Sequence, residues 1–333
     1  MANKSEVIKF IRNIKLEDRV DLIFHNDLDG FASGILFYDM LTERGCKNIG
    51  IFPFEITNNH SKETKEINGE KVIILDLALN IISPVISKLK DKKILYIDHH
   101  KTDKPIENPN VLEYRNKEGE YTPCSRMVFE LIGGREWLSV AGTVSDIGYN
   151  YPENKKFIDD FLKGNNLKFQ EFFDNTVNPL SYLLIFLEKN PQMAFEIIKD
   201  TTNYKQVENL RKYTRPAEEE VNKFIEDFRK NNERLGKVNF YFFKPKLNIR
   251  PYVITSISLA NPKEIYVFAC PENGKVSLSA RNNSKEEDVL ELLGKATQNL
   301  ENSSFGGHVA AAGGYIQKQD LEKFKENLRK IKL

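Results

Sequence analysis

The sequence predicts an α/β protein: a parallel sheet with helices on both faces, then a helical linker and a smaller mixed α/β domain. Three observations support this. Strand-like segments alternate with helical ones of roughly ten residues early in the chain, as in parallel sheets. A highly charged helical stretch covers 206–231, and strand-rich composition returns from residue 238. A chain of 333 residues also exceeds what one hydrophobic core usually serves.

The first domain is predicted to contain five strands. Apolar residues at helical spacing place the first helix at 5–14, with Ser5 as its cap. Short apolar runs predict strands at 20–24, 49–54, 72–77, 94–97 and 111–114. Helices are expected at 31–41, at 80–90 with Asn80 as cap, at 125–132 and at 137–147.

The second half of the chain changes character. Residues 151–235 are predicted to be helical and contain no catalytic pattern. Strands are expected at 238–243, 252–254, 265–269 and 276–280, with a hairpin turn at Glu272-Asn273-Gly274. A helix follows at 286–296, and an alanine-rich helix is expected after Gly306-Gly307-His308. We therefore predict a catalytic domain at 1–200, a helical linker at 201–235 and a second domain at 236–333.

Composition is that of an ordinary globular protein, with 40% hydrophobic and 29% charged residues. The chain has 49 basic and 48 acidic residues, a net charge of only +1, so any affinity for phosphate must come from a local cluster of residues. Three isolated cysteines indicate neither a disulfide framework nor a zinc–thiolate site. The sequence has no signal-peptide core and no apolar run of roughly 20 residues. We expect a cytoplasmic protein that does not contact membranes.

The first strand runs directly into His25-Asn26-Asp27-Leu28-Asp29-Gly30. In an extended backbone His25, Asp27 and Asp29 would point to one side. A lone Asp-x-Asp-Gly is more often a capped turn at the start of a helix, since Asp and Gly both serve there. His25 has the same two-residue spacing as Asp27 and Asp29, and this favours a functional site over a simple capped turn.

Two further strands end in polar, metal-capable residues. Asp76 lies among apolar neighbours, where burial is costly unless the carboxylate is paired or metal-bound. Asp98-His99-His100 closes the next strand, at the sheet edge where ligands bind in open α/β folds. A pair of surface histidines is the alternative for this triplet. Asp146, in an apolar helical stretch, would by itself be solvated, and His60 is taken as an ordinary loop histidine.

The predicted sheet brings these side chains to one edge. Carboxylates and imidazoles without thiolates suit Mn²⁺, Mg²⁺ or Fe²⁺ better than a structural zinc. The set exceeds what one ion with open positions needs, which favours two ions acting on a phosphoryl group. Without metals, so many acids would repel one another. The set comprises His25, Asp27, Asp29, Asp76, Asp98, His99, His100 and Asp146.

Together with Gly306-Gly307-His308, these motifs resemble those of the DHH phosphoesterase family and its associated C-terminal domain, from about residue 20 to 330. The family includes RecJ-like exonucleases, oligoribonucleases (nanoRNases), dinucleotide phosphodiesterases, nucleotide phosphatases and pyrophosphatases. The segment beginning at His25 is similar to that of some bacterial oligoribonucleases. It departs from the longer His-x-x-x-Asp-x-Asp of the pyrophosphatase and nanoRNase branches.

The resemblance implies a role for each motif residue. Asp76 would bridge two ions, Asp98 would orient a metal-ligand imidazole, and His100 would face the scissile phosphate. Arg281 would reach a substrate phosphate. The remaining metal ligands would be His25, Asp27, Asp29, His99 and Asp146. The terminal phosphate or next nucleotide would meet Gly306, Gly307 and His308.

The implied activity is a two-metal phosphodiesterase, with Mn²⁺ as the expected ion and Mg²⁺ as the alternative. The net charge is near neutral, and no additional domain for binding long single strands is expected. As substrates, short single-stranded RNA or DNA and dinucleotides therefore rank above long DNA. The alternatives are a nucleotide phosphatase, a cyclic- or linear-dinucleotide phosphodiesterase and a RecJ-like single-strand DNA exonuclease. A non-catalytic scaffold relative ranks last. Oligomeric state is left open, a homodimer included.

Overall fold

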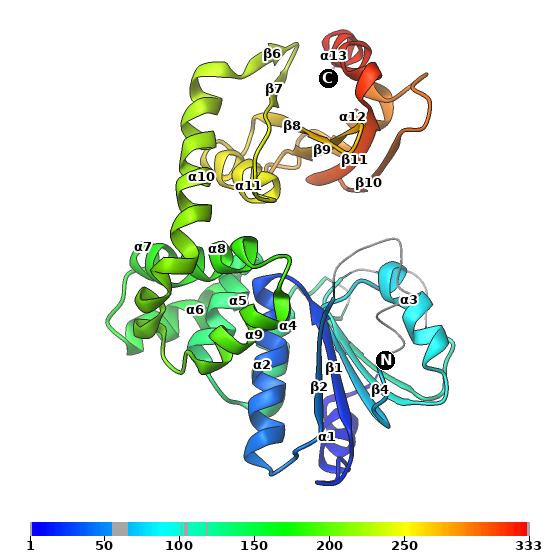
Figure 1. Ribbon diagram of the computed structural model, residues 1–333, viewed down its shortest axis with the longest axis vertical. Coiled ribbons are helices and arrows are strands. Elements are labelled where there is room, and N and C mark those ends of the chain that lie inside the picture. The colour runs from blue at the N-terminus through cyan, green and yellow to red at the C-terminus, as the bar shows by residue number, and fades with distance from the viewer. Residues whose placement is uncertain (1, 55–65, 101, 103–105, 118, 332–333) are drawn as a thin grey trace. The chain divides into compact units, whose positions relative to one another are not determined.

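The computed structural model divides into two compact units, Met1–Thr214 and Arg215–Leu333, and each is described by itself (Figure 1). It describes residues 2–54, 66–100, 102, 106–117 and 119–331. His60, expected to be an ordinary loop histidine, lies outside the described residues.

The N-terminal unit is built on a five-stranded sheet in the order β2-β1-β3-β4-β5. Every neighbouring pair is parallel, so all five carboxyl ends lie at the same edge. Strands β1 and β3 are buried almost throughout, as expected for sheets covered on both faces. The strands are β1 (Val20–His25), β2 (Ile49–Phe54), β3 (Lys71–Leu75), β4 (Lys93–Asp98) and β5 (Val111–Arg115).

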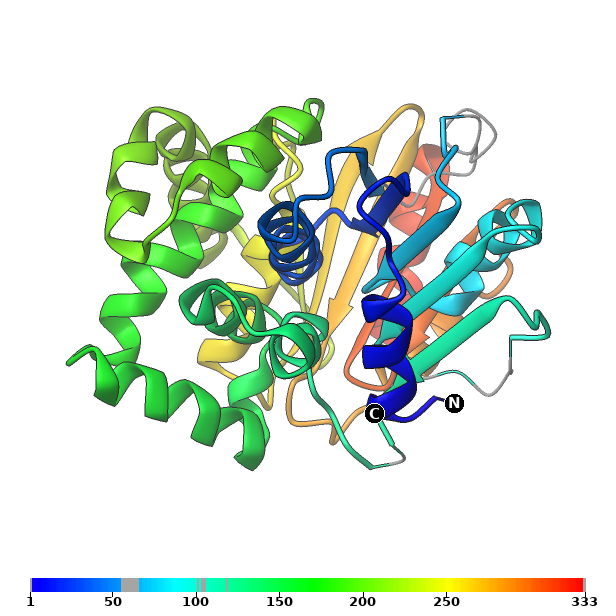
Figure 2. The same cartoon turned by 90° about the horizontal axis from the view of Figure 1, so that it is seen from below.

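Helices cover both faces of this sheet. On one face α2 (Leu28–Glu43) is buried along most of its length among α1, α4 and α5, and these share one apolar core. On the other face α3 (Leu79–Lys88) packs over a second core. Figures 1 and 2 show α2 and α3 on opposite sides of the strands. The predicted parallel sheet with helices on both faces is confirmed.

Further helices complete the unit on the α2 side. No helix among the described residues is long and apolar enough to cross a bilayer. The charged stretch predicted near 206–231 forms one 3₁₀ segment, Tyr204–Leu210, and then α10. The other helices up to residue 231 are α1 (Lys4–Arg12), α4 (Cys124–Ile132), α5 (Glu136–Ser145), α6 (Pro152–Gly164), α7 (Phe169–Phe172), α8 (Asn178–Phe186), α9 (Pro191–Asp200) and α10 (Arg211–Asn231).

The C-terminal unit contains a six-stranded mixed sheet in the order β10-β11-β9-β8-β7-β6. Only β7 and β8 pair in parallel. Helices α12 and α13 pack on one face around an apolar core, and α11 contacts β8 and β9. The elements are β6 (Glu233–Leu235), β7 (Val238–Phe242), α11 (Arg250–Ala260), β8 (Ile265–Glu272), β9 (Lys275–Arg281), α12 (Val289–Ala296), β10 (Ser304–His308), β11 (Ala311–Gln317) and α13 (Leu321–Lys330).

Two predicted elements of this unit are wrong. The strand at 252–254 is part of α11, which begins with Pro251 in its first turn and buries Val253 and Ile254. The alanine-rich helix after His308 is β11, hydrogen-bonded to β10 and β9. Its glycines permit this pairing, because a Cβ on Gly314 would clash with the Ser304 carbonyl.

Two predicted helix caps are also displaced. Asn3, not Ser5, caps α1, and its side chain and that of Glu6 form a reciprocal capping box. Asn80 lies inside α3, which begins at Leu79. The hairpin at Asn273-Gly274 joins β8 to β9 as predicted, with positive φ at both residues.

Candidate metal centre

The segment from His25 to Gly30 lies where β1 ends and α2 begins. Asp27 caps α2: its Oδ1 accepts a hydrogen bond from Gly30 N at 2.9 Å, and its Oδ2 lies 2.8 Å from Nδ1 of His25. A Cβ on Gly30 would collide with the His25 carbonyl oxygen. The glycine therefore allows the helix to start directly against the strand, and the carboxylate stays at the sheet edge.

Asp29, in the first turn of α2, is buried against the N-terminus of α4. Its Oδ2 accepts a hydrogen bond from Cys124 N at 2.7 Å, and its Oδ1 accepts bonds from Ser125 N at 3.0 Å and from the Ser125 hydroxyl. Gly142 of α5 leaves the necessary room, since a Cβ there would contact both Ser125 Oγ and Asp29 Oδ1. This carboxylate is consequently held in one orientation.

Asp76 lies between the other ligand candidates. It follows β3 with a left-handed φ of 58° and is 1% exposed. Its Oδ1 is 3.0 Å from Nε2 of His99, and its Oδ2 is 3.9 Å from Nδ1 of His25. One carboxylate thus faces both histidines.

His99 and Asp146 lie on the far side of Asp76 from His25. The His99 Nε2 is 3.6 Å from Oδ2 of Asp146, the residue that ends α5. The hydroxyl of Tyr121 donates to Asp146 Oδ2 at 2.5 Å, and its ring meets His99 edge-on at 5.2 Å. Sequence reasoning missed Tyr121, because a loop tyrosine carries no motif that distinguishes it.

Asp98 and His100 form a separate pair. Nδ1 of His100 lies 2.7 Å from Asp98 Oδ1, and the hydroxyl of Tyr96 donates to Asp98 Oδ2 at 2.7 Å. Asp98 is completely buried, and the bond to His100 lowers the pKa of its carboxyl group although burial raises it. The imidazole that Asp98 contacts is therefore that of His100. The expectation that Asp98 orients a metal-ligand imidazole stays a prediction.

The residues present fit two divalent ions. Potential ligand atoms gather in three groups, and Asp76 belongs to two of them. The buried atoms without a hydrogen-bond partner among the described residues include three at this cluster: His25 Nδ1, Asp76 Oδ1 and His99 Nδ1. Unpartnered buried polar atoms are costly, and a cation among the carboxylates would satisfy the first two. The groups are His25–Asp27–Asp76, Asp29–His99–Asp146 and Asp76–Asp98–His99–His100.

Electrostatics also favour cation binding. Burial and the charge of Asp146 raise the pKa of Asp29 to about 7. Burial and the charges of Asp27 and Asp29 raise the pKa of Asp76 well above its ordinary value. Burial would lower the pKa of His25, but Asp27 raises it to about 9. The metal-free cluster therefore holds extra protons near neutral pH.

We expect metal binding to displace these protons, so that affinity increases with pH. Because the folded carboxyls have raised pKa values, the metal-free protein should lose stability as pH rises from about 4 through about 7. The rise in unfolding temperature caused by Mn²⁺ should be larger at about pH 8 than at about pH 6. Thermal unfolding with and without Mn²⁺ measures this, and a metal effect independent of pH would contradict it.

The C-terminal unit carries a second set of predicted residues on one face of its sheet. Arg281 of β9, Ala311 of β11 and His308 of β10 are direct cross-strand neighbours, so their side chains point the same way. Gly306 and Gly313 occupy the next row beside Ser279 and leave that face clear. The opposite face carries the apolar core through Ala280 and Ala312. Arg281, Gly306 and His308 are therefore gathered on the face away from this core.

The two motif glycines are required for different reasons, which two variants can separate. A Cβ on Gly306 meets nothing within 4 Å, so Gly306→Ala should leave the unfolding temperature unchanged. It should raise KM about tenfold or more, the scale of one methylene in a binding site. Gly307 has φ 136°, and a Cβ there would strike Ala311 and Ala312. Gly307→Ala should destabilise by about 1–3 kcal/mol. Equal stability losses in both variants would contradict this assignment.

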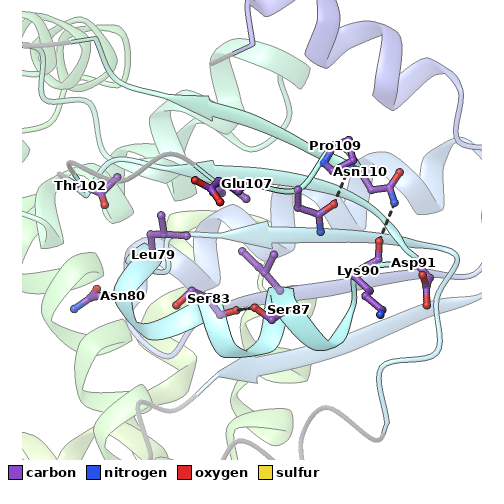
Figure 3. A pocket seen from close by; sticks show the side chains of 13 residues that line it. Leu79, Asn80, Ser83, Ser87, Lys90, Asp91, Thr102, Glu107, Pro109 and Asn110 are labelled. Carbon is purple, nitrogen blue, oxygen red and sulfur yellow. Dashed lines mark hydrogen bonds between the residues drawn. The ribbon is translucent and has the colours of Figure 1, made fainter.

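A groove of about 1070 Å³ lies between α3 and the segment before β5 (Figure 3). Its polar side chains include Ser83, Ser87, Lys90 and Glu107, and Asn110 donates a hydrogen bond to the Lys90 carbonyl at 2.8 Å. None of the predicted site residues lines it. The groove is thus separate from the cluster at the strand ends.

Comparison with known proteins agrees with this arrangement. A family model described as the DHH family, N-terminal domain, matches residues 19–157, and one described as the DHHA1 domain matches residues 251–332. The chain belongs to the DHH family. The resemblance predicted from the motifs is confirmed, and the C-terminal unit contains the DHHA1 domain of this DHH protein.

Solved structures share the fold of the DHH protein. A crystal structure of exonuclease RecJ bound to manganese matches with a TM-score of 0.74 at 14% identity, covering 99% of this chain and 94% of that one. RecJ in complex with Mn²⁺ from Thermus thermophilus matches with a TM-score of 0.72 at 13% identity, over 98% of this chain. The DHH protein spans 53% of that longer chain.

A further match is the DHH domain of a protein described as a member of a family of ribosomal proteins, with a TM-score of 0.69 at 14% identity. It covers 100% of this chain and 93% of that one. Among curated proteins, no sequence match was found. At these identities the likeness shows a RecJ-like fold, while the family supports a phosphoesterase with a divalent-metal site.

Proposed function

We propose that this DHH protein is a metal-dependent phosphodiesterase that hydrolyses short single-stranded nucleic acids at a two-metal centre. The observation that carries the proposal is the position of Asp76, whose two carboxylate oxygens face two different groups of ligand atoms. A carboxylate shared in this way can hold two ions side by side. Mn²⁺ is the proposed ion, with Mg²⁺ as the alternative.

Two divalent ions, when bound, would activate water and stabilise the charge on the phosphoryl oxygens. The ligands would be His25, Asp27 and Asp76 for one ion and Asp29, His99 and Asp146 for the other, with Asp76 shared. His100 would donate a proton to the leaving oxygen, since Asp98 holds its Nδ1 and leaves Nε2 for the substrate. Tyr121 would fix the orientation of Asp146.

The C-terminal unit supports a substrate larger than a single phosphate. Its exposed strand β10 carries Gly306, Gly307 and His308, and Arg281 shares a cross-strand row with His308. Backbone amides, an imidazole and a guanidinium suit phosphate oxygens. In this proposal residues 1–200 supply the chemistry and residues 236–333 bind the remainder of the nucleic acid.

The test is a time course of products from end-labelled RNA and DNA of graded length, with Mn²⁺ and with Mg²⁺. We expect the shortest chains to be cut fastest. Preference for long DNA would favour a RecJ-like exonuclease instead, and release of inorganic phosphate from mononucleotides would favour a phosphatase. No hydrolysis of any substrate with either ion would overturn the proposal and favour a non-catalytic role.

A further inference from the structure

A block of four polar side chains lies at the ends of β4 and β5, on the face of the sheet that α3 covers. Side chains alternate along a strand, so Tyr96 and Asp98 of β4 share this face. In the parallel register Tyr96 is paired with Glu113 of β5. Asp98 is likewise paired with Arg115. The strand pairing therefore brings these four groups together.

Tyr96 is the centre of this block. Its side chain is fully buried, and its hydroxyl oxygen lies 2.7 Å from Asp98 Oδ2 and 2.7 Å from the carbonyl oxygen of Leu77. Leu77 directly follows Asp76, the carboxylate proposed to be shared by two ions. One hydroxyl thus joins the segment that carries Asp76 to the carboxylate that contacts His100.

Arg115 fixes the position of Tyr96. Its guanidinium lies over the Tyr96 ring, with Cζ 4.9 Å from the ring centre, and its Nη2 donates a hydrogen bond to the hydroxyl at 3.2 Å. Its Nε forms an ion pair with Glu113 at 2.6 Å, and both side chains are largely buried. Burial and the charge of Asp98 raise the pKa of the Tyr96 hydroxyl, so it keeps its proton. The charged carboxylate is the stronger of the two acceptors for that proton.

Tyr96 and His100 are the hydrogen-bond partners of the Asp98 carboxylate in the part of the chain that the structure describes. Each holds one oxygen, so loss of either bond would allow the carboxylate to turn. We propose that Tyr96 and Arg115 are positioning residues, which fix the carboxylate of Asp98. Through that carboxylate they direct Nε2 of His100 at the leaving oxygen of the substrate. This inference rests on the proposed function for the substrate, but the network itself stands on distances within the N-terminal unit.

The first test measures the hydrogen bond of His100 in the metal-free full chain, without substrate. An imidazole Nδ1–H bound to a buried carboxylate exchanges slowly with water, and NMR of protein with isotope-labelled histidine detects it; His100→Gln identifies the signal. Tyr96→Phe removes one hydroxyl and should speed this exchange about tenfold or more, the scale of one lost hydrogen bond to a charged group. Tyr114 packs against the core on the opposite face of β5, so Tyr114→Phe should leave the signal unchanged. An unchanged signal in Tyr96→Phe would overturn the inference.

The second test measures turnover of two substrates by Tyr96→Phe. For a dinucleotide, kcat should fall about ten- to a hundredfold with KM unchanged. For bis-p-nitrophenyl phosphate, whose leaving group needs no proton, kcat should change little. The rise in unfolding temperature on adding Mn²⁺ should equal that of the wild type. Equal losses on both substrates would show a general structural defect and would also overturn the inference.

Arg115 is tested through its dependence on Tyr96. Arg115→Lys keeps a positive charge beside Glu113 but lacks the planar fork that reaches the hydroxyl. It should lower kcat for the dinucleotide several-fold in the wild type and no further in Tyr96→Phe, because it acts through that hydroxyl. Additive losses in the double variant would remove Arg115 from the proposal. If the wild type hydrolyses neither substrate, the proposed function fails, and the histidine exchange still decides whether Tyr96 positions His100.

Discussion

Replacing Asp76 with asparagine is expected to abolish hydrolysis and leave the N-terminal unit folded. Both oxygens of this carboxylate face ligand groups, so the change should weaken both metal positions at once. Activity should fall by at least about 10²–10³-fold, the scale for loss of one electrostatic stabilising group. Asparagine suits the test because it keeps the shape of aspartate and tolerates the left-handed φ of 58°, which would strain alanine.

Stability measurements separate this effect from misfolding. Without metal, Asp76→Asn should be at least as stable as the wild type, because repulsion with Asp27 and Asp29 is relieved. The rise in unfolding temperature on adding Mn²⁺ should be lost. Asp159→Asn, an exposed change on α6 in the same unit, serves as the control and should retain both activity and metal response. A full Mn²⁺ response in Asp76→Asn would show that Asp76 is not a ligand.

Replacing His100 with glutamine is expected to remove proton donation without removing the metals. The turnover number should fall by about 10²–10⁴-fold, the usual contribution of general acid–base catalysis. Glutamine can still donate a hydrogen bond to Asp98, which would otherwise be a buried charge with one partner fewer. The Mn²⁺-induced rise in unfolding temperature should be unchanged.

The leaving group provides a sharper control for His100. Bis-p-nitrophenyl phosphate has a leaving group that needs no protonation, so His100→Gln should impair its hydrolysis far less than that of a dinucleotide. Asp98→Asn should share this pattern, because it acts by orienting the same imidazole. Equal defects on both substrates, or loss of the metal response, would instead make His100 a metal ligand.

The sequence was sufficient to predict the parallel sheet, because alternating strand-like and helical segments are visible in local periodicity, and a parallel sheet brings its strand ends to one edge. It was insufficient where contacts between distant segments decide. Tyr252, Val253 and Ile254 have strand-forming side chains, yet Pro251 and burial of one face make them helical. The alanines after His308 favour a helix locally, but pairing with β9 and β10 makes them a strand.

Prediction of the metal centre from the sequence was limited in the same way. That His25, Asp76 and His99 lie together follows from the order of the strands, whereas the partner of Asp98 could not be predicted. Successive residues beyond a strand end can turn in any direction, and only the structure shows that His100 reaches Asp98. Tyr121 was missed for the same reason, since it contacts Asp146 across 25 positions.

The hydrogen bonds that Cys124 and Ser125 donate to Asp29 have a consequence for how the protein acquires its metals. The carboxylate is oriented by Ser125, 96 positions along the chain, so the geometry at Asp29 exists only after α4 has docked on α2. Loop closure over such a separation is a slow, late event in folding. We therefore expect the ion held by Asp29, His99 and Asp146 not to act as a nucleus around which the nascent chain organises. That position should be filled only in a folded domain, so metal supply should affect how much protein is active more than how fast it folds.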